Sequence, residues 1–361
     1  MARRTLNAAG NSLTQRAIVV AVDTRASEYS IDPELSEFEA LAQAAGARIL
    51  ERVIQRRDAV DPATLVGSGK AREIAERAEE IRADMLLVLN DLRPRQRKNL
   101  EKIIPLPIVD RTMLILDVFA RHARSREGKL QVELAQLRYR QSNLIGVGAD
   151  LSRLGGGIGT RGPGETKLEV DRRRIGERIS VLRRLLADVR RQRAVRRSSP
   201  HREPLVALVG YTNVGKSSLL NALARSNAYV ADQPFATLDP LIRRAYLKPG
   251  EYVRLADTVG FITDLPRDLI NAFRATLEEL GEADLLLHVL DASNPQWPRQ
   301  RAAVEAILQE LELDHAPRLS VFNKADLIVP EPTDEAGELY VSAATGVGLD
   351  ALRAALIARL T

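Results

Sequence analysis

The segment Gly210-Tyr-Thr-Asn-Val-Gly-Lys-Ser217 has the residue types and spacing of a loop that holds nucleotide phosphates. It follows an apolar run at residues 205–209 and precedes a helical pattern, which is the strand–loop–helix context that such a loop requires. Glycine lets the backbone approach the phosphates closely, and the amides at a helix N-terminus point towards them. We expect Lys216 to reach the β- and γ-phosphates and Ser217 to bind Mg²⁺.

Two further motifs supply groups for the same phosphates. Asp257-Thr-Val-Gly260 closes an apolar run at 252–255, so the Asp257 carboxylate can hold the Mg²⁺ and the Gly260 amide can reach the γ-phosphate. Thr237 is predicted to bind the Mg²⁺ only when the γ-phosphate is present. The predicted catalytic residues are Lys216, Thr237 and Gly260, and the predicted metal ligands are Ser217, Thr237 and Asp257.

The motif Asn323-Lys-Ala-Asp326 follows an apolar run at 319–322 and favours guanine over adenine. The Asp326 carboxylate can accept hydrogen bonds from the guanine N1–H and exocyclic amine, and adenine offers no such pair. We expect Asn323 to brace the base and its loops, and the Ala343 amide to meet the guanine O6. The residues predicted to bind GTP or GDP are Gly210, Asn213, Val214, Gly215, Lys216, Ser217, Ser218, Asp257, Gly260, Asn323, Lys324, Asp326, Ser342, Ala343 and Ala344.

Two positions modify the expected chemistry. Phe261 stands where Ras-like GTPases place the glutamine that orients the attacking water, so we predict slow intrinsic hydrolysis that a bound partner accelerates. Asn213 resembles the asparagine of a GTPase subgroup that binds K⁺ beside the phosphates; the alternative is that it only braces the loop. Arg267 and Arg274 are candidates for the residue that stimulates hydrolysis.

These motifs must be positioned by short strands. From residue 205 to residue 361, apolar runs alternate with helical patterns at 216–224, 267–279, 299–312 and 349–360, which predicts a doubly wound α/β domain. Residues 1–110 alternate in the same way and predict a smaller α/β subdomain with a mainly parallel sheet. A linker is expected at 198–204.

Residues 111–197 have a different period. A heptad seam is formed by Ile175, Ile179, Leu182, Leu186 and Val189, and residues 130–144 also carry leucines at helical spacing. The segment 146–165 has too many glycines for either a helix or a strand. The pattern therefore predicts an antiparallel helical hairpin with a flexible glycine-rich tip, and the fold class of the whole chain is α/β with this hairpin inserted.

Composition restricts the class of protein. The chain has 361 residues, no cysteine and 28% charged residues, and it lacks an apolar run of bilayer length or an N-terminal signal, so we expect a cytoplasmic monomer without a membrane span. The net charge is +5, and arginines crowd residues 172–202. That cluster is either a solvated helix face or a surface for the phosphates of nucleic acid.

The whole pattern resembles the HflX family of GTPases. The resemblance is carried by Arg124-Ser-Arg-Glu-Gly-Lys-Leu-Gln-Val-Glu-Leu-Ala-Gln-Leu137, by the glycine-rich stretch from Leu151 to Leu168, by Thr64-Leu-Val-Gly-Ser-Gly-Lys70 and by Asp257-Thr-Val-Gly-Phe-Ile262. It implies an N-terminal α/β subdomain with a helical hairpin, then a Ras-like G domain. It also implies binding to the large ribosomal subunit, with the tip on ribosomal RNA, and in some members the splitting of stalled ribosomes under stress. Some relatives carry a further C-terminal domain, whereas this chain ends at Thr361 after the last expected helix.

Three function classes follow. The leading interpretation is a ribosome-associated GTPase. The alternative is a signalling switch whose hairpin binds a protein, and steep salt sensitivity would favour the RNA partner. An ATP-driven RNA-remodelling enzyme would need a second nucleotide site, for which only Val66-Gly-Ser-Gly-Lys70 is available. That segment has the wrong spacing for a phosphate loop and is better explained as a turn before a helix.

Overall fold

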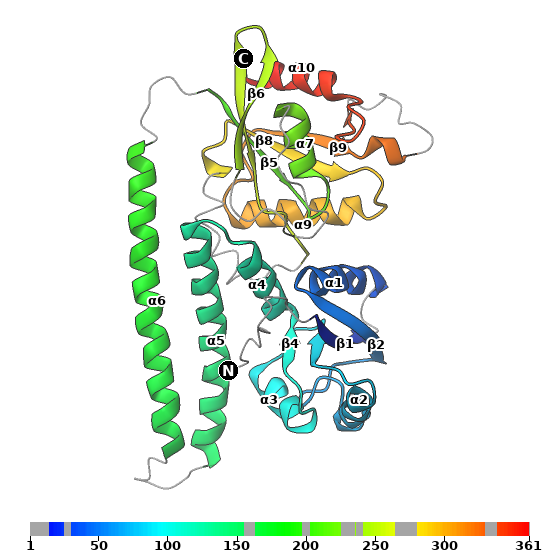
Figure 1. Ribbon diagram of the computed structural model, residues 1–361, viewed down its shortest axis with the longest axis vertical. Helices are drawn as coiled ribbons and strands as arrows, with labels where there is room; N and C mark the ends of the chain where they lie inside the picture. The colour runs from blue at the N-terminus through cyan, green and yellow to red at the C-terminus, as the bar shows by residue number, and fades with distance from the viewer. Residues whose placement is uncertain are drawn as a thin grey trace. The chain divides into compact units, whose positions relative to one another are not determined.

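The structure is a computed structural model, and it describes residues 14–24, 30–154, 163–196, 203–224, 235, 241–263, 280–328 and 338–360. The chain forms two compact units. The first comprises Met1–Arg121 and Glu133–Arg183, and the second comprises His122–Val132 and Arg184–Thr361. Each unit is built around one sheet (Figure 1).

The sheet of the first unit has four parallel strands in the order β2-β1-β3-β4. The strands are β1 (Gln15–Thr24), β2 (Ala47–Arg57), β3 (Met85–Val88) and β4 (Ile108–Asp110). They are connected by the helices α1 (Asp32–Ala44), α2 (Ser68–Glu80) and α3 (Pro94–Ile103). Figure 1 shows α1 on one face of this sheet and α2 with α3 on the other. The predicted parallel α/β arrangement is confirmed.

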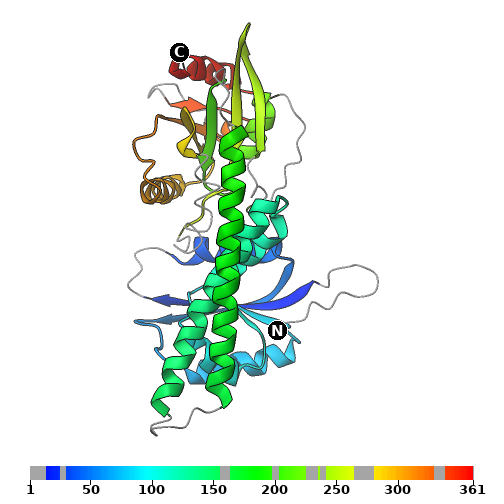
Figure 2. The ribbon, with the colours of Figure 1, turned by 90° about the vertical axis from the view of Figure 1, so that its left-hand side faces the viewer.

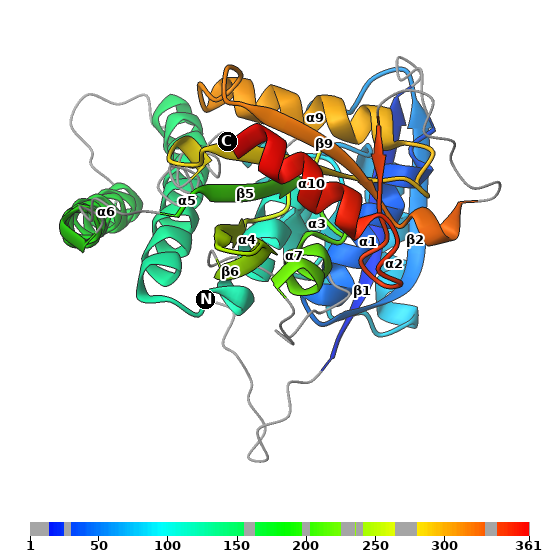
Figure 3. The ribbon, with the colours of Figure 1, turned by 90° about the horizontal axis from the view of Figure 1, so that it is seen from above.

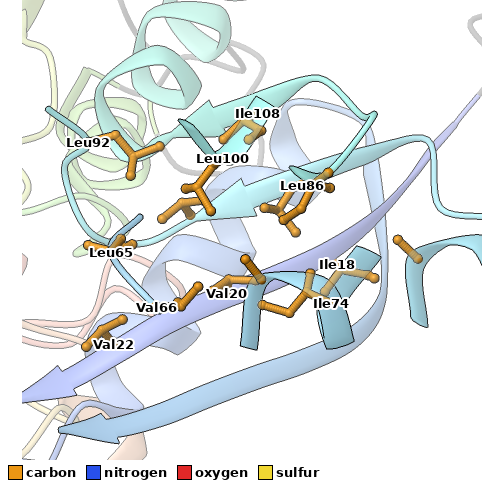
Figure 4. Packing of buried hydrophobic residues seen from close by; sticks show 14 of the residues in the cluster. Ile18, Val20, Val22, Leu65, Val66, Ile74, Leu86, Leu92, Leu100 and Ile108 are labelled. Atoms are coloured by element: carbon orange, nitrogen blue, oxygen red, sulfur yellow. The ribbon is translucent and has the colours of Figure 1, made fainter. Parts of the chain in front are cut away.

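The core of this unit explains why β1 is central. Ile18, Val20 and Val22 alternate along β1 and pack with Ile74 of α2 and Leu100 of α3 in one buried cluster (Figure 4). The intervening residues of β1 are equally buried, because a central parallel strand is covered on both faces. Burying each such aliphatic side chain contributes about 1.5–3 kcal/mol to folding.

Three helices follow β4, namely α4 (Arg111–His122), α5 (Arg126–Leu154) and α6 (Pro163–Arg196). Figures 1 and 2 both show α5 and α6 side by side. The Arg178 guanidinium of α6 donates two hydrogen bonds, of 2.8 and 3.0 Å, to the Glu133 carboxylate of α5. The predicted seam of α6 is buried at Ile179, Leu182 and Leu186.

The glycine-rich tip differs from our expectation. We predicted a loop over 146–165, but α5 continues to Leu154 and α6 already begins at Pro163. Glycine in a helix costs only about 1 kcal/mol per residue relative to alanine, and proline is favoured at the first helical position. Residues 155–162 lie outside the described residues.

A buried polar contact fixes the middle of α5 on the first sheet. Asp110, at the end of β4, is 1% exposed and accepts hydrogen bonds from Arg97 of α3 and from the Tyr139 hydroxyl of α5. Its other oxygen accepts the Met113 amide at 2.9 Å. Burial and the nearby Asp110 charge raise the pKa of Tyr139, so its hydroxyl stays protonated and can donate.

The second unit contains a six-stranded sheet in the order β10-β9-β8-β5-β7-β6. Its strands are β5 (Leu205–Gly210), β6 (Leu241–Lys248), β7 (Glu251–Asp257), β8 (Leu285–Asp291), β9 (Arg318–Asn323) and β10 (Leu339–Tyr340). All neighbouring pairs are parallel except β6 with β7. The helices are α7 (Lys216–Ala224), α9 (Trp297–Glu310) and α10 (Leu349–Leu360), and a 3₁₀ turn spans Ala325–Leu327.

Figure 3 shows α9 on one side of this sheet and α7 with α10 on the other, as in a doubly wound domain. The predicted helix at 267–279 lies outside the described residues. None of the helices in the described ranges has the length and apolar character to cross a bilayer.

Candidate nucleotide-binding site

Four parallel strands of the second sheet bring their carboxyl ends to one edge. The segments that follow β5, β7, β8 and β9 start from neighbouring strands, because the order in the sheet is β9-β8-β5-β7. Ligands of doubly wound sheets bind at this edge. All the motifs singled out for chemistry, except the one around Thr237 and the one after β10, begin at these four strand ends.

The loop from Gly210 to Lys216 is conformationally demanding. Gly210 has φ +155° and a Cβ there would lie 2.3 Å from the Val289 carbonyl oxygen. Gly215 has φ +89°, and its Cβ would lie 2.3 Å from the Asn323 side-chain nitrogen. Both positions therefore require glycine. Asn213, in the same loop, has φ +61° and an exposed side chain.

Lys216 is buried at the start of α7. Its ammonium donates to the carbonyl oxygens of Gly210 at 3.1 Å and Tyr211 at 2.6 Å. Burial lowers the pKa of Lys216 to about 8, and the Asp257 charge opposes this shift. A buried cation held mainly by neutral carbonyls can gain strongly from an arriving phosphate.

Ser217 and Asp257 meet beside this lysine. The Ser217 hydroxyl donates to one carboxylate oxygen of Asp257 at 2.5 Å, and Asp257 is fully buried at the end of β7. A hydroxyl and a carboxylate are hard oxygen donors of the kind that Mg²⁺ takes together with phosphate oxygens. The residues present therefore fit a magnesium ion.

Gly260 lies directly against the loop. A Cβ at Gly260 would come 2.9 Å from Thr212 Cγ2 and 3.0 Å from Lys216 Nζ. The next residue, Phe261, is 2% exposed, and its amide donates to the Gly210 carbonyl at 3.1 Å. Its carbonyl accepts the Thr212 amide at 2.8 Å. The segment after β7 is thus paired with the phosphate loop.

Asn323 connects three loops. Its side chain is buried, donates to the Val214 carbonyl at 2.9 Å and accepts the Ala343 amide at 3.0 Å. Ser342 is fully buried and its hydroxyl accepts the Thr345 amide at 3.1 Å, which closes the turn that presents Ala343 and Ala344. Asp326, in the 3₁₀ turn, and Ala344 are exposed. An exposed Asp326 carboxylate is accessible to a base.

One residue at this edge was missed by sequence reasoning. Asp291 ends β8 and its carboxylate accepts the Lys324 ammonium at 2.7 Å. A carboxylate that closes an apolar strand, as Asp257 also does, was the available signal.

Thr237, Arg267 and Arg274 lie outside the described residues. The segment Val66–Lys70 lies in the first unit, at the start of α2. Gly67 has φ +81° and precedes the first residue of α2, while the Lys70 ammonium pairs with Glu73 at 2.5 Å. This geometry agrees with a turn before a helix.

Comparison with known proteins finds matches in three consecutive parts of the chain. Three family models match: "GTP-binding GTPase N-terminal" over residues 32–120, "GTP-binding GTPase Middle Region" over residues 122–199, and "50S ribosome-binding GTPase" over residues 205–324.

Curated relatives match along nearly the whole chain. The "GTPase HflX" of Caldanaerobacter subterraneus is 47% identical over 344 residues, which cover 95% of this chain and 80% of that protein. The "GTPase HflX" of Escherichia coli is 45% identical, covering 91% and 79%. Among solved structures, the complex of SsGBP with GDP is similar, with a TM-score of 0.53, 23% identity and coverage of 95% of this chain and 98% of that chain. This last likeness concerns the fold.

Proposed function

Because this chain belongs to the HflX family of GTPases, we propose that it couples GTP binding and hydrolysis to association with the large ribosomal subunit and its RNA. In this proposal it acts in splitting or rescuing ribosomes under stress. GTP binding and hydrolysis to GDP and phosphate follow from family membership. The roles of individual residues and the ribosomal partner are what we propose in addition.

The phosphates would lie on the loop 210–216. This loop connects the end of β5 to the start of α7, and the backbone amides at a helix N-terminus favour an anion. Lys216 would exchange its two carbonyl contacts for phosphate oxygens, whose negative charge would raise its lowered pKa again and stabilise the charged ammonium. Gly260 lies near enough to Lys216 for its amide to respond to a γ-phosphate.

Ser217 and Asp257 would hold Mg²⁺, with Thr237 as a third ligand. When bound, the ion neutralises charge on the phosphates. The 2.5 Å contact between the two side chains supports this assignment, because both oxygen atoms could then bind the same ion. Asn213 is also a candidate ligand for a K⁺ ion beside the phosphates. Equal hydrolysis rates in potassium and sodium buffers would exclude this role.

Guanine would be bound by Asp326 and by the Ala343 amide, whose single hydrogen would be shared between Asn323 and the guanine O6. The observation that carries this assignment is the Asn323 side chain, because it holds the phosphate loop and the Ala343 turn together through two hydrogen bonds. Lys324, Ser342 and Ala344 complete that side of the site. The Asp326 carboxylate distinguishes guanine from adenine as described above.

The partner proposal depends on the arginines of α6. Arg172 and Arg183 are exposed, and neither makes an ion pair with another residue of the described ranges. They are separated by eleven positions, or about three helical turns, so they lie on the same side of the helix. Unpaired arginines along one helix side suit a phosphate backbone. The family model over 205–324, described as a ribosome-binding GTPase, supports the same partner.

Co-sedimentation with purified large ribosomal subunits tests this proposal. We expect binding with a non-hydrolysable GTP analogue, weaker binding with GDP, and a steep loss with rising salt. Replacing Arg172 and Arg183 by Glu should reduce binding, whereas replacing the exposed Arg72 and Lys102 of the first unit should have little effect. If binding depended neither on the bound nucleotide nor on the salt concentration, a protein partner and a signalling role would be favoured.

Phe261 supports one further part of the proposal. Its buried side chain has no group that could orient water, so intrinsic hydrolysis should be slow. Ribosomal subunits should accelerate it. Equal rates with and without subunits would contradict this.

A further inference from the structure

Asp291 is the one carboxylate at the nucleotide edge of the described sheet that the assignments above do not use, and it is 8% exposed. It lies at the end of β8, between β5 and β9 in the sheet. One of its oxygens accepts the Ser293 amide at 3.0 Å and the Ser293 hydroxyl at 2.6 Å. The carboxylate is therefore held in one orientation by its own turn.

The other oxygen of Asp291 receives the Lys324 ammonium at 2.7 Å. Lys324 has φ +65°, a left-handed conformation that is uncommon outside glycine. Its side chain is 28% exposed and that of Asp291 is 11% exposed, so the pair is partly shielded from water. A backbone hydrogen bond also joins the segments that follow β8 and β9, because the Ala292 amide donates to the Asn323 carbonyl at 2.9 Å.

These contacts place the lysine at the guanine site. Lys324 stands between Asn323 and Asp326, so its aliphatic stem borders the place where the base would lie. A free lysine samples many rotamers, and binding would have to order them. With its ammonium held by Asp291, the stem is already ordered before the nucleotide arrives.

We propose that Asp291 is a positioning residue of the guanine site, which fixes the Lys324 side chain as a preformed wall for the base and thereby slows nucleotide dissociation. This inference rests on the proposed guanine site. It assigns no contact between Asp291 and the nucleotide, because its carboxylate is already occupied by Ser293 and Lys324. Asp291 should affect how long the nucleotide stays and leave the hydrolysis step unchanged.

The dissociation rate of a fluorescent GDP from the full-length protein tests the proposal. Asp291→Asn keeps the size of the side chain and an acceptor for Ser293 but removes the charge, and it should speed dissociation by about tenfold. Asp291→Ala should release GDP at least as fast as Asp291→Asn. Single-turnover hydrolysis of bound GTP should stay within about twofold of wild type.

A double-mutant cycle separates positioning from a general loss of stability. Lys324→Met should speed dissociation by a similar factor, and the double variant should be no faster than either single variant. Asp284→Asn is the matched control, because Asp284 directly precedes the first residue of β8, away from the nucleotide edge, and accepts the Leu205 amide at 2.7 Å. It should leave the dissociation rate unchanged.

Three outcomes would overturn the inference: a wild-type dissociation rate in Asp291→Asn, additive effects in the cycle, or an equal effect of Asp284→Asn. The variant Asp326→Asn separately tests whether guanine is bound at the proposed site. If that variant still preferred GDP over xanthosine diphosphate, the guanine assignment itself would be wrong, whatever Asp291 does.

Discussion

The side-chain amide of Asn323 donates to the carbonyl oxygen of Val214, 2.9 Å away and 109 residues earlier in the sequence. The same side chain accepts the Ala343 amide. One buried residue thus holds the proposed phosphate loop and the proposed base-binding turn at a fixed separation. Because both contacts are made between groups of the protein itself, the fold holds this part of the site in place.

Replacing Asn323 by Ala should weaken GDP binding at least about tenfold and lower the free energy of unfolding by about 1–3 kcal/mol, since two backbone groups lose their partner. Titration with fluorescent GDP and urea denaturation measure the two effects. Asn99→Ala is the control: Asn99 also donates to a backbone carbonyl, that of Ala63 at 3.0 Å, but is only partly buried in the first unit. Equal effects of the two substitutions would contradict a special role for Asn323.

The buried Lys216 should make stability depend on pH in a defined window. Its pKa is lowered to about 8 in the folded protein, from 10.5. Between these values the unfolded chain holds the proton and the folded chain does not, so the free energy of unfolding rises with pH. Below about pH 8 the folded protein carries the full penalty of a buried charge.

Lys216→Met removes this titration. In nucleotide-free protein, the variant should be more stable than wild type at pH 7, and the difference should shrink as pH rises towards 10.5. Urea midpoints across this range provide the measurement. Parallel profiles for the two proteins would show that Lys216 does not titrate there.

Gly260 should not tolerate a side chain. Gly260→Ala would force a methyl group against Thr212 and Lys216, so we expect a loss of about 1–3 kcal/mol in stability and at least roughly tenfold slower GTP hydrolysis. Gly176→Ala is the contrasting substitution. It lies in α6 with open space around the added atom, and should raise stability by about 0.5–1 kcal/mol. Similar effects at both positions would contradict the steric argument.

Tyr139 should contribute to fixing α5 on the first sheet. Tyr139→Phe removes the hydroxyl that donates to Asp110 and leaves Arg97 in place, so the expected loss is about 1–2 kcal/mol in the free energy of unfolding. Tyr252→Phe is the control, because its exposed ring lies beside Arg244 and is retained in the variant. Urea denaturation distinguishes the two, and an unchanged midpoint for Tyr139→Phe would reject the contribution.

Strands with continuous apolar runs could be predicted from the sequence, whereas β2 and β6, each at one edge of its sheet, could not. The predicted runs at 205–209, 252–255 and 319–322 correspond to β5, β7 and β9, because strands inside a parallel sheet are buried on both faces. The edge strands β2 and β6 were missed: arginines and glutamates interrupt both, and much of each strand remains in contact with solvent. Similarly, glycine content led us to end α5 before residue 146, although helical structure continues to Leu154.

The sequence by itself determined the chemistry of this protein, because the phosphate loop, Asp257, Asn323 and Asp326 are recognisable from residue type, spacing and position after apolar runs. It also determined the order of these motifs along parallel strands. Only the tertiary structure decided which of them touch. The pairs Asn323–Val214 and Lys324–Asp291 form because the sheet order brings β9 next to β8 and β8 next to β5, and no local pattern encodes that order.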